Sequence, residues 1–293
     1  MTGGQGFIGR ALISRLLTRG HSVTAGIRSL DDQNLVQDSR LTTVEFNEDT
    51  DFLYLGSQDN FDCIVHLATR YSLDESLQSV NEMIKSNYNL ILNLLLGAAA
   101  KSTPLVLAGS FTQNSSANGG PVSVYSLTKD AASQASTYFA NEHRMKILEL
   151  RIFDTYGVGD NRRKFLDLLV DAALSGEQLN ASSGEQMIDL VNIVDVIDGL
   201  ENSLTLLQKF IPGEHRIFEI ASRNPKSLRE LASLVETATK KNINVKWGFY
   251  PYRRFEMFNY LTKYPLLPNW HSRIDLMSGI QELVESRGLK FNE

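Results

Sequence analysis

The chain has 293 residues, of which 42% are hydrophobic and 22% charged, and its formal net charge is -5 at pH 7. This composition fits a globular protein of one large or two smaller domains, and its mild acidity argues against a nucleic-acid partner. The single cysteine, Cys63, excludes an intramolecular disulfide, and no apolar run approaches the roughly 18 residues of a membrane span. We therefore expect a cytoplasmic protein with no membrane partner.

The first element is a glycine-rich loop in which Gly3, Gly6 and Gly9 are three residues apart, and an amphipathic helical pattern starts at Phe7. Because glycine has no Cβ, such a loop lets its backbone approach a pyrophosphate, and the N–H groups of the following helix point at the same anion. The usual fingerprint spaces its first two glycines by two residues, so this turn is slightly longer. The loop predicts a dinucleotide site; a plain connecting turn is the alternative.

Such a loop normally follows a buried strand at the centre of a doubly wound sheet, yet only Met1 and Thr2 precede it here. Losing roughly four or five buried apolar residues, at about 1.5–3 kcal/mol each, would cost an amount similar to the whole stability of a domain, about 5–15 kcal/mol. We therefore expect the natural chain to start several residues upstream of Met1.

The next predicted strand covers residues 21–27 and ends at Ile27, followed by Arg28. In dinucleotide-binding folds this place usually holds an acidic residue that binds the ribose 2′-hydroxyl of NAD. Here no carboxylate repels a 2′-phosphate, and Arg28 is able to bind one. The sequence therefore favours NADP(H), with NAD(H) as the alternative if Arg28 is only a solvated loop residue.

Three further strands are predicted at residues 41–46, 61–68 and 105–108, with a helix at 77–100 between the last two. The apolar run 61–68 is typical of a strand buried on both faces. His66 lies inside it, but no residue stands at metal-ligand spacing from His66, so we predict a hydrogen-bonded core histidine and no metal site.

Ser110 lies just after the strand predicted at 105–108, at its carboxyl end. Tyr125 and Lys129 lie in the first turns of the next predicted helix, at 125–143. The last two are four residues apart and so share one helix face. A phenol has a pKa near 10, which a cation one turn away lowers toward neutrality. A strand-end serine hydroxyl is suited to hold a substrate oxygen in line. Together with the glycine loop, these three residues predict a proton-transfer site.

The motifs T-G-G-x-G-F-I-G, H-L-A, the strand-end Ser110, Y-x-x-x-K and L-R-I-F-D-T-Y-G resemble the extended short-chain dehydrogenase/reductase family. This is the NAD-dependent epimerase/dehydratase group that acts on nucleotide sugars. The resemblance implies Ser110, Tyr125 and Lys129 as the catalytic trio. It implies Ser110, Thr155 and Arg253 as substrate ligands, with Arg253 on the diphosphate. It also implies the following cofactor-binding residues: Gly3, Gly6, Phe7, Ile8, Gly9, Arg28, Leu67, Ala68, Tyr125 and Lys129.

Within this family, segments such as H-L-A-T-R-Y, S-F, G-E-Q-x-I-D and R-R-F-E most resemble the CDP-abequose synthase group, which reduces the 4-keto group of a deoxy sugar nucleotide with NADPH. Two departures bear on the substrate. Ile188 stands where the family usually has the arginine of R-D-F, and Asp154 replaces an asparagine. A 4-epimerase of the same family is the first alternative, and a catalytically silent nucleotide sensor is the second.

We predict an α/β protein with a Rossmann-type doubly wound parallel sheet at residues 1–155. Residues 156–293 mainly form a small α/β substrate domain, with some segments returning to the first domain. The remaining predicted elements are a strand at 148–153 and helices at 165–174, 193–207 and 228–239, the last with Ser227 as its N-cap. The expected partners are a nucleotide-sugar substrate and a second copy of the chain in a homodimer.

Overall fold

The computed structural model describes residues 1–28, 35–46, 61–115, 119–253, 256–258 and 262–288. The chain divides into two compact units. Unit 1 consists of Met1–Ile152, Ile197–Ile220 and Lys263–Trp270, and unit 2 of Phe153–Val196, Ala221–Thr262 and His271–Glu293. Among the described residues, no helix is both long and apolar enough to cross a membrane.

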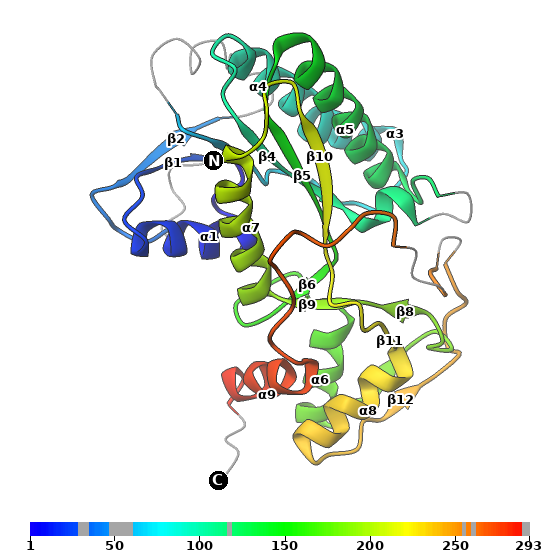
Figure 1. Cartoon of the computed structure of the whole chain (residues 1–293). Coiled ribbons are helices and arrows are strands. Elements are labelled where there is room, and N and C mark those ends of the chain that lie inside the picture. The colour runs from blue at the N-terminus through cyan, green and yellow to red at the C-terminus, as the bar shows by residue number, and fades with distance from the viewer. Residues whose placement is uncertain (29–34, 47–60, 116–118, 254–255, 259–261, 289–293) are drawn as a thin grey trace. The chain divides into compact units, whose positions relative to one another are not determined.

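A parallel sheet forms the centre of unit 1 (Figure 1). Four strands are hydrogen bonded in the order β10 (His215–Ile220), β5 (Ile147–Ile152), β4 (Leu105–Ser110) and β3 (Ile64–His66), and β1 (Val23–Ile27) pairs with β2 (Leu41–Glu45). Thr2 makes isolated parallel bridges to Gly26 and His66, and so connects β1 to β3. Met1 and Thr2 therefore stand at the centre of the sheet, where the sequence places its short first strand.

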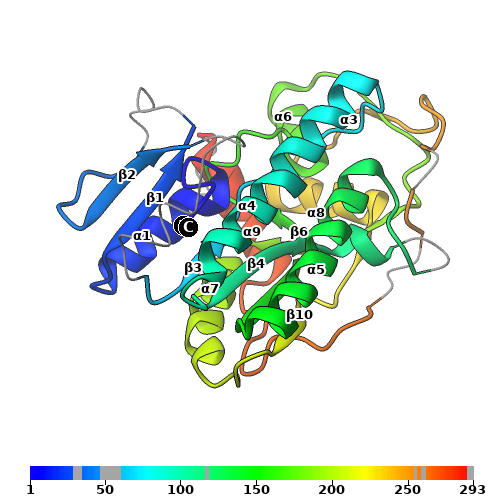
Figure 2. The ribbon, with the colours of Figure 1, turned by 90° about the horizontal axis from the view of Figure 1, so that it is seen from above.

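Helices cover both faces of this sheet (Figures 1 and 2). On one face lie α3 (Leu77–Ile84), α4 (Leu90–Ala99) and α5 (Val124–His143), and on the other α1 (Phe7–Thr18) and α7 (Ile193–Gln208). Leu95 of α4, Leu107 of β4 and Phe139 of α5 belong to one buried core cluster. Arg15 of α1 donates to Asp198 of α7 at 2.5 Å, which joins the two helices of the second face.

The observed bounds correct two predictions. The strand predicted at 61–68 has only three residues, Ile64–His66, because it is paired in register with β4 over these three residues only. The helix predicted at 77–100 is interrupted by a π-helix, Lys85–Asn89, between α3 and α4. His66 is 1% exposed and its Nδ1 lies 2.8 Å from Thr2 Oγ1, so it is the hydrogen-bonded core residue that the sequence predicts.

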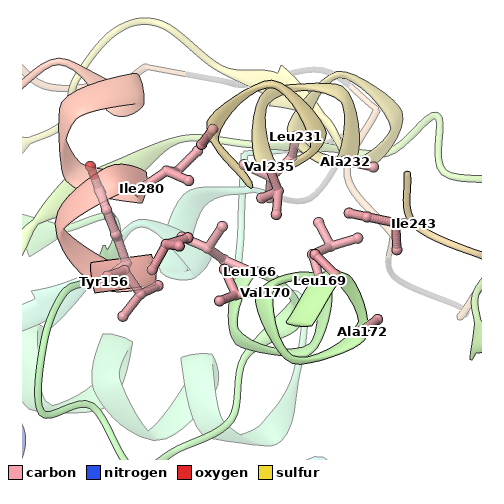
Figure 3. Packing of buried hydrophobic residues seen from close by; sticks show 14 of the residues in the cluster. Tyr156, Leu166, Leu169, Val170, Ala172, Leu231, Ala232, Val235, Ile243 and Ile280 are labelled. Atoms are coloured by element: carbon pink, nitrogen blue, oxygen red, sulfur yellow. The ribbon is translucent and has the colours of Figure 1, made fainter. Parts of the chain in front are cut away.

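Unit 2 packs three helices around a second core (Figure 3). These are α6 (Phe165–Ser175), α8 (Leu228–Thr239) and α9 (Leu276–Ser286), of which the sequence analysis missed α9. Leu169, Val235 and Ile280 meet in this core. Ser227 caps α8 as predicted, because its side chain accepts from Glu230 N while Glu230 Oε2 accepts from Ser227 N at 2.7 Å.

Short strand pairs complete unit 2, and none of them is predicted from the sequence. The parallel pairs are β6 (Asp154–Tyr156) with β9 (Leu190–Asn192) and β7 (Leu179–Asn180) with β12 (Val245–Lys246); β8 (Met187–Ile188) pairs antiparallel with β11 (Lys226–Ser227). Strands of two or three residues carry too little periodicity to be read from a sequence. The strand β10 of unit 1, which returns to the sheet after α7, was missed as well.

Candidate functional site

The glycine loop of unit 1 is folded so tightly that side chains do not fit in it. Gly3 has φ +74°, and a Cβ there would lie 2.7 Å from Ala68 N and 2.8 Å from the Leu67 carbonyl carbon. A Cβ on Gly9 would lie 2.1 Å from Gly3 O, and Gly6 N donates to the same oxygen at 3.0 Å. The loop therefore needs glycine at Gly3 and Gly9, while a Cβ on Gly6 would meet only Gly3 O, at 3.3 Å. It leads directly into the N-terminus of α1, which begins at Phe7 and continues through Ile8.

The segment after β3 lies against this loop. Thr2 Oγ1 accepts from Ala68 N at 3.3 Å, and Leu67 N donates to Thr2 O at 3.3 Å. Burial lowers the pKa of His66 to about 3, so the ring that contacts Thr2 is neutral. Leu67 and Ala68, which the resemblance implies as cofactor ligands, are thus held beside Gly3.

Arg28 follows β1 beside the same loop. Its backbone N donates to Gln5 Oε1 at 2.8 Å, and its side chain is exposed. Arg10 of α1 donates from Nη1 to Gln5 O at 2.7 Å. The structure therefore brings two guanidinium-bearing residues to Gln5, at the end of β1 where Ile27 stands instead of an acidic residue.

Ser110 is the last residue of β4 and is buried. Its hydroxyl oxygen lies 2.8 Å from Thr112 Oγ1 and accepts from Thr112 N at 3.3 Å. Its backbone N donates to Gln113 Oε1 at 2.7 Å, and this contact closes a capping box at the start of the 3-10 helix Phe111–Asn114. These contacts fix the orientation of the strand-end hydroxyl.

Tyr125 and Lys129 lie on the first turns of α5, one helical turn apart. The helix begins with a capping box between Ser123 and Ser126, which fixes its first turn. Lys129 is 4% exposed, and its Nζ donates to Ala108 O of β4 at 2.8 Å. Burial lowers the pKa of Lys129 to about 8, so the ammonium loses its proton only in mildly alkaline solution. Tyr125 is half-buried and meets the ring of Tyr71 edge to face, with centroids 5.0 Å apart.

Asn87 connects the segment after β3 with α5. It sits in the π-helix and is 1% exposed. Its Oδ1 accepts from Arg70 N at 2.7 Å and from Thr69 Oγ1 at 3.1 Å, and its Nδ2 donates to Arg70 O at 2.9 Å and to Thr128 Oγ1 at 3.1 Å. Short π-helices within α-helices are frequent at functional sites.

Two predicted substrate ligands belong to unit 2. Thr155 of β6 is 2% exposed, and its Oγ1 donates to Phe153 O at 3.3 Å. Arg253 is exposed, and its backbone N donates to Glu256 Oε1 at 3.4 Å. Their role in binding a substrate stays a prediction.

The NAD dependent epimerase/dehydratase family model matches residues 1–221 of this chain. The chain belongs to this family. Its members are NAD-dependent enzymes, and the residues of unit 1 fit a dinucleotide: a loop in which no Cβ fits at Gly3 or Gly9 opens directly into a helix N-terminus.

Relatives of known activity differ in the reaction that they catalyse. The CDP-abequose synthase of Salmonella typhimurium is 26% identical over 97% of this chain and 96% of that protein. The UDP-glucose 4-epimerase of Corynebacterium glutamicum is 23% identical over 82% of this chain and 79% of that protein. Among solved structures, MoeE5 in complex with UDP-glucuronic acid and NAD has a TM-score of 0.83 at 22% identity, covering 98% and 97% of the two chains. This likeness confirms the Rossmann-like α/β fold.

The sequence did not predict the buried polar residues that contact the elements carrying Ser110, Tyr125 and Lys129. Asn87 and Gln113 were absent from the predicted site, although both side-chain amides are buried. Gln113 accepts a hydrogen bond from Ser110 N of β4, and Asn87 donates one to Thr128 Oγ1 of α5. Glu149 and Arg151 were also missed, and for these a signal existed: two charges alternate with apolar residues in a strand, I-L-E-L-R-I, that is buried at all six positions.

Proposed function

We propose that this enzyme reduces the 4-keto group of a nucleotide-linked deoxyhexose, with NADPH as the reductant. The observation that carries the proposal is the placement of Ser110, Tyr125 and Lys129 in unit 1: β4 ends at Ser110, and the Lys129 ammonium of α5 is bonded to β4 two residues earlier, at Ala108 O. The similarity to CDP-abequose synthase over 97% of the chain supports the reaction type.

Each residue of the trio has one role in this proposal. Tyr125 donates its hydroxyl proton to the carbonyl oxygen of the substrate, as a general acid. Ser110 donates a hydrogen bond to the same oxygen and holds it in line. The Lys129 ammonium, one helical turn away, stabilises the tyrosinate that forms. When bound, NADPH supplies the hydride.

The preference for NADPH rests on the end of β1. Ile27 offers no carboxylate to repel a 2′-phosphate, and Arg28 and Arg10 both contact Gln5 beside the glycine loop. A guanidinium group binds phosphate through charge-assisted, often bidentate, hydrogen bonds. NADH is the alternative reductant if these two side chains point away from the ribose.

In unit 2, we propose Thr155 as a sugar ligand and the exposed Arg253 as a diphosphate ligand, because the guanidinium fork of Arg253 matches two phosphate oxygens.

We also propose a homodimer. Its support is the exposure of large apolar side chains on α3 and α5, with Leu77 78% and Leu127 57% exposed. Light scattering on the purified protein would measure the assembly.

A 4-epimerase is the second candidate, which the similarity to the Corynebacterium glutamicum enzyme favours. Two assays distinguish the candidates. The first supplies a 4-keto-6-deoxy sugar nucleotide with NADPH and follows absorbance at 340 nm. The second supplies a 4-hydroxy sugar nucleotide without added cofactor and separates the hydroxyl epimers. Interconversion in the second assay, without NADPH consumption in the first, would contradict the reductase and establish the epimerase.

A non-catalytic sensor is the remaining candidate, and the intact Ser110, Tyr125 and Lys129 argue against it. Tyr125→Phe tests it directly. We expect this variant to bind NADPH as the parent does and to lose turnover by about 10²- to 10⁴-fold, the usual contribution of a positioned acid. Equal turnover in the two proteins would remove Tyr125 from the mechanism.

A further inference from the structure

The polar face of α5 continues beyond Tyr125 and Lys129 into the core of unit 1. Its residues follow one another at four-residue spacing: Tyr125, Lys129, Ser133 and Thr137. Residues at this spacing lie above one another on a helix. Ser133 Oγ donates to Glu149 Oε2 of β5 at 2.6 Å, and Thr137 Oγ1 lies 2.9 Å from His215 Nδ1 of β10. The helix face that carries Tyr125 and Lys129 therefore also makes polar contacts with two strands, β5 and β10.

A buried ion pair lies at the centre of this line. Glu149 is 0% exposed and Arg151 2%, and Arg151 Nη1 donates to Glu149 Oε1. Arg151 Nη2 also donates to Ser133 Oγ at 3.3 Å, and His215 Nε2 lies 3.2 Å from Glu149 Oε2. Replacing a buried ion pair by apolar residues is often neutral or stabilising. Stability is therefore a weak reason for this pair.

The pair lies directly under the end of β4. A Cβ on Gly109 would lie 2.7 Å from Glu149 Oε1 and 2.9 Å from Arg151 Nη1. Gly109 precedes Ser110, so the two charges reach the backbone beside the proposed substrate-binding hydroxyl. Only a glycine at this position leaves them room.

The charged and titratable groups around Lys129 come from several elements. Burial lowers the pKa of Lys129, Glu149 opposes this effect, and Arg151 adds to it. From β3, His66 is a further titratable group, and the Lys129 charge contributes to lowering the pKa of His66. The remaining groups surround the ion pair: His215 and Glu219 on β10, with Glu219 in register with Arg151, and Tyr264, whose ring centroid is 5.6 Å from the Arg151 guanidinium.

We propose that Glu149 is a positioning residue that keeps Lys129 protonated, and so sets the highest pH at which Tyr125 and Lys129 work together; this rests on the proposed function. Arg151 and Ser133 hold the carboxylate in place, and Arg151 also keeps it ionised. Burial opposes ionisation of Glu149, yet Arg151, His215 and Ser133 together lower its pKa below the usual value. The carboxylate is thus a fixed negative charge across the working range of the enzyme.

The test compares three variants of the full chain with the parent: Glu149→Gln, Glu149→Asp and the double variant Glu149→Met with Arg151→Met. The first readout needs no substrate. Protein labelled with ¹³C at lysine Cε is titrated from pH 6 to pH 11 by NMR, and the Lys129 signal is identified by its loss in Lys129→Met. The second readout is the pH dependence of kcat/KM for reduction. Thermal unfolding checks that each variant is folded.

We expect the Lys129 titration midpoint of the parent, about pH 8, to fall by about one unit in Glu149→Gln, because this variant no longer supplies the buried negative charge that favours the protonated form of Lys129. The alkaline limit of kcat/KM should fall with it. Glu149→Asp should restore most of the midpoint. The double variant removes two opposing charges and should titrate closer to the parent than Glu149→Gln does, whereas a merely structural role of the pair predicts the parent's Lys129 midpoint in every folded variant.

An unchanged Lys129 midpoint in folded Glu149→Gln would overturn the inference, as would a midpoint in the double variant as low as in the single one. If Glu149→Gln does not fold, the double variant and Glu149→Asp are compared with the parent instead. A Lys129 titration midpoint that differs from that of the parent by more than one pH unit in both variants would overturn the inference. Failure of the proposed function is a separate result: Lys129→Met would then retain reductase activity, or the parent would reduce no 4-keto sugar nucleotide.

Discussion

Replacing Asn87 by alanine should weaken both the fold and the cofactor site. The side chain makes four hydrogen bonds, and two of them satisfy the backbone N–H and C=O of Arg70. A buried polar group left without its partner costs about 1–3 kcal/mol. Because Arg70 is half-buried, water recovers part of this cost. We expect the free energy of unfolding to fall by about 2–3 kcal/mol, which is about 3–5 °C in Tm for a chain of this size.

The same change should act on the glycine loop, the proposed cofactor site. Asn87 holds Thr69 and Arg70, which directly follow Leu67 and Ala68, the two residues against which Gly3 packs. Without this tether the loop gains freedom that cofactor binding must remove, so we expect the Kd for NADPH to rise about tenfold, the equivalent of about 1.4 kcal/mol.

Thermal unfolding and isothermal titration calorimetry measure the two effects. Asn89→Ala is the matched control, since Asn89 lies two residues further along the same π-helix and is exposed. A change of less than about 0.5 kcal/mol is expected there, as for most surface substitutions. If Asn87→Ala and Asn89→Ala had the same stability and the same Kd, the tether would not exist.

Four further outcomes are expected. Gly9→Ala should stay folded and lose NADPH affinity at least about tenfold, because its Cβ would lie 2.1 Å from Gly3 O; calorimetry measures it. Arg28→Ala should weaken NADPH binding by about 10- to 100-fold and leave the Kd for NADH nearly unchanged, and equal affinities of the parent for the two cofactors would contradict the assignment. Lys129→Met should abolish reduction yet raise the free energy of unfolding by about 2–3 kcal/mol at pH 7. The folded-state pKa of Lys129, about 8, lies below the ordinary 10.5, because a charge on Lys129 is costly in its buried site. The parent carries this charge at pH 7 and loses it in the folded state as pH rises from 8 to 10.5, so the extra stability of Lys129→Met should shrink over this range. Urea titrations at several pH values measure it. His66→Gln should make the free energy of unfolding less dependent on pH in acid. Burial lowers the pKa of His66 from 6.5 to about 3, so between pH 6 and pH 4 the ring of the parent costs up to about 1.4 kcal/mol of stability per pH unit. An unchanged slope of stability against pH in the variant would refute this contribution of His66.

Several features of this protein follow from local sequence. The helix that starts at Phe7, the strand that ends at Ser110 and the long helix that carries Tyr125 and Lys129 were predicted within one or two residues of their observed bounds. Each has strong periodicity, and polar residues cap or end it. The four-residue spacing of Tyr125 and Lys129 alone places them on one helix face, whatever surrounds the helix.

Other features depend on residues that are far apart in the chain. The sequence does not show that Asn87 reaches both Arg70 and Thr128, or that Glu149 meets Ser133 and His215, because these contacts join elements that only the sheet order brings together. A buried charge or amide is costly unless its partners are in place, and partners are a property of the packed structure. The sequence by itself determined the fold family and predicted Ser110, Tyr125 and Lys129 as reactive groups. The tertiary structure alone decided which buried polar residues contact the elements that carry them and what charge surrounds Lys129.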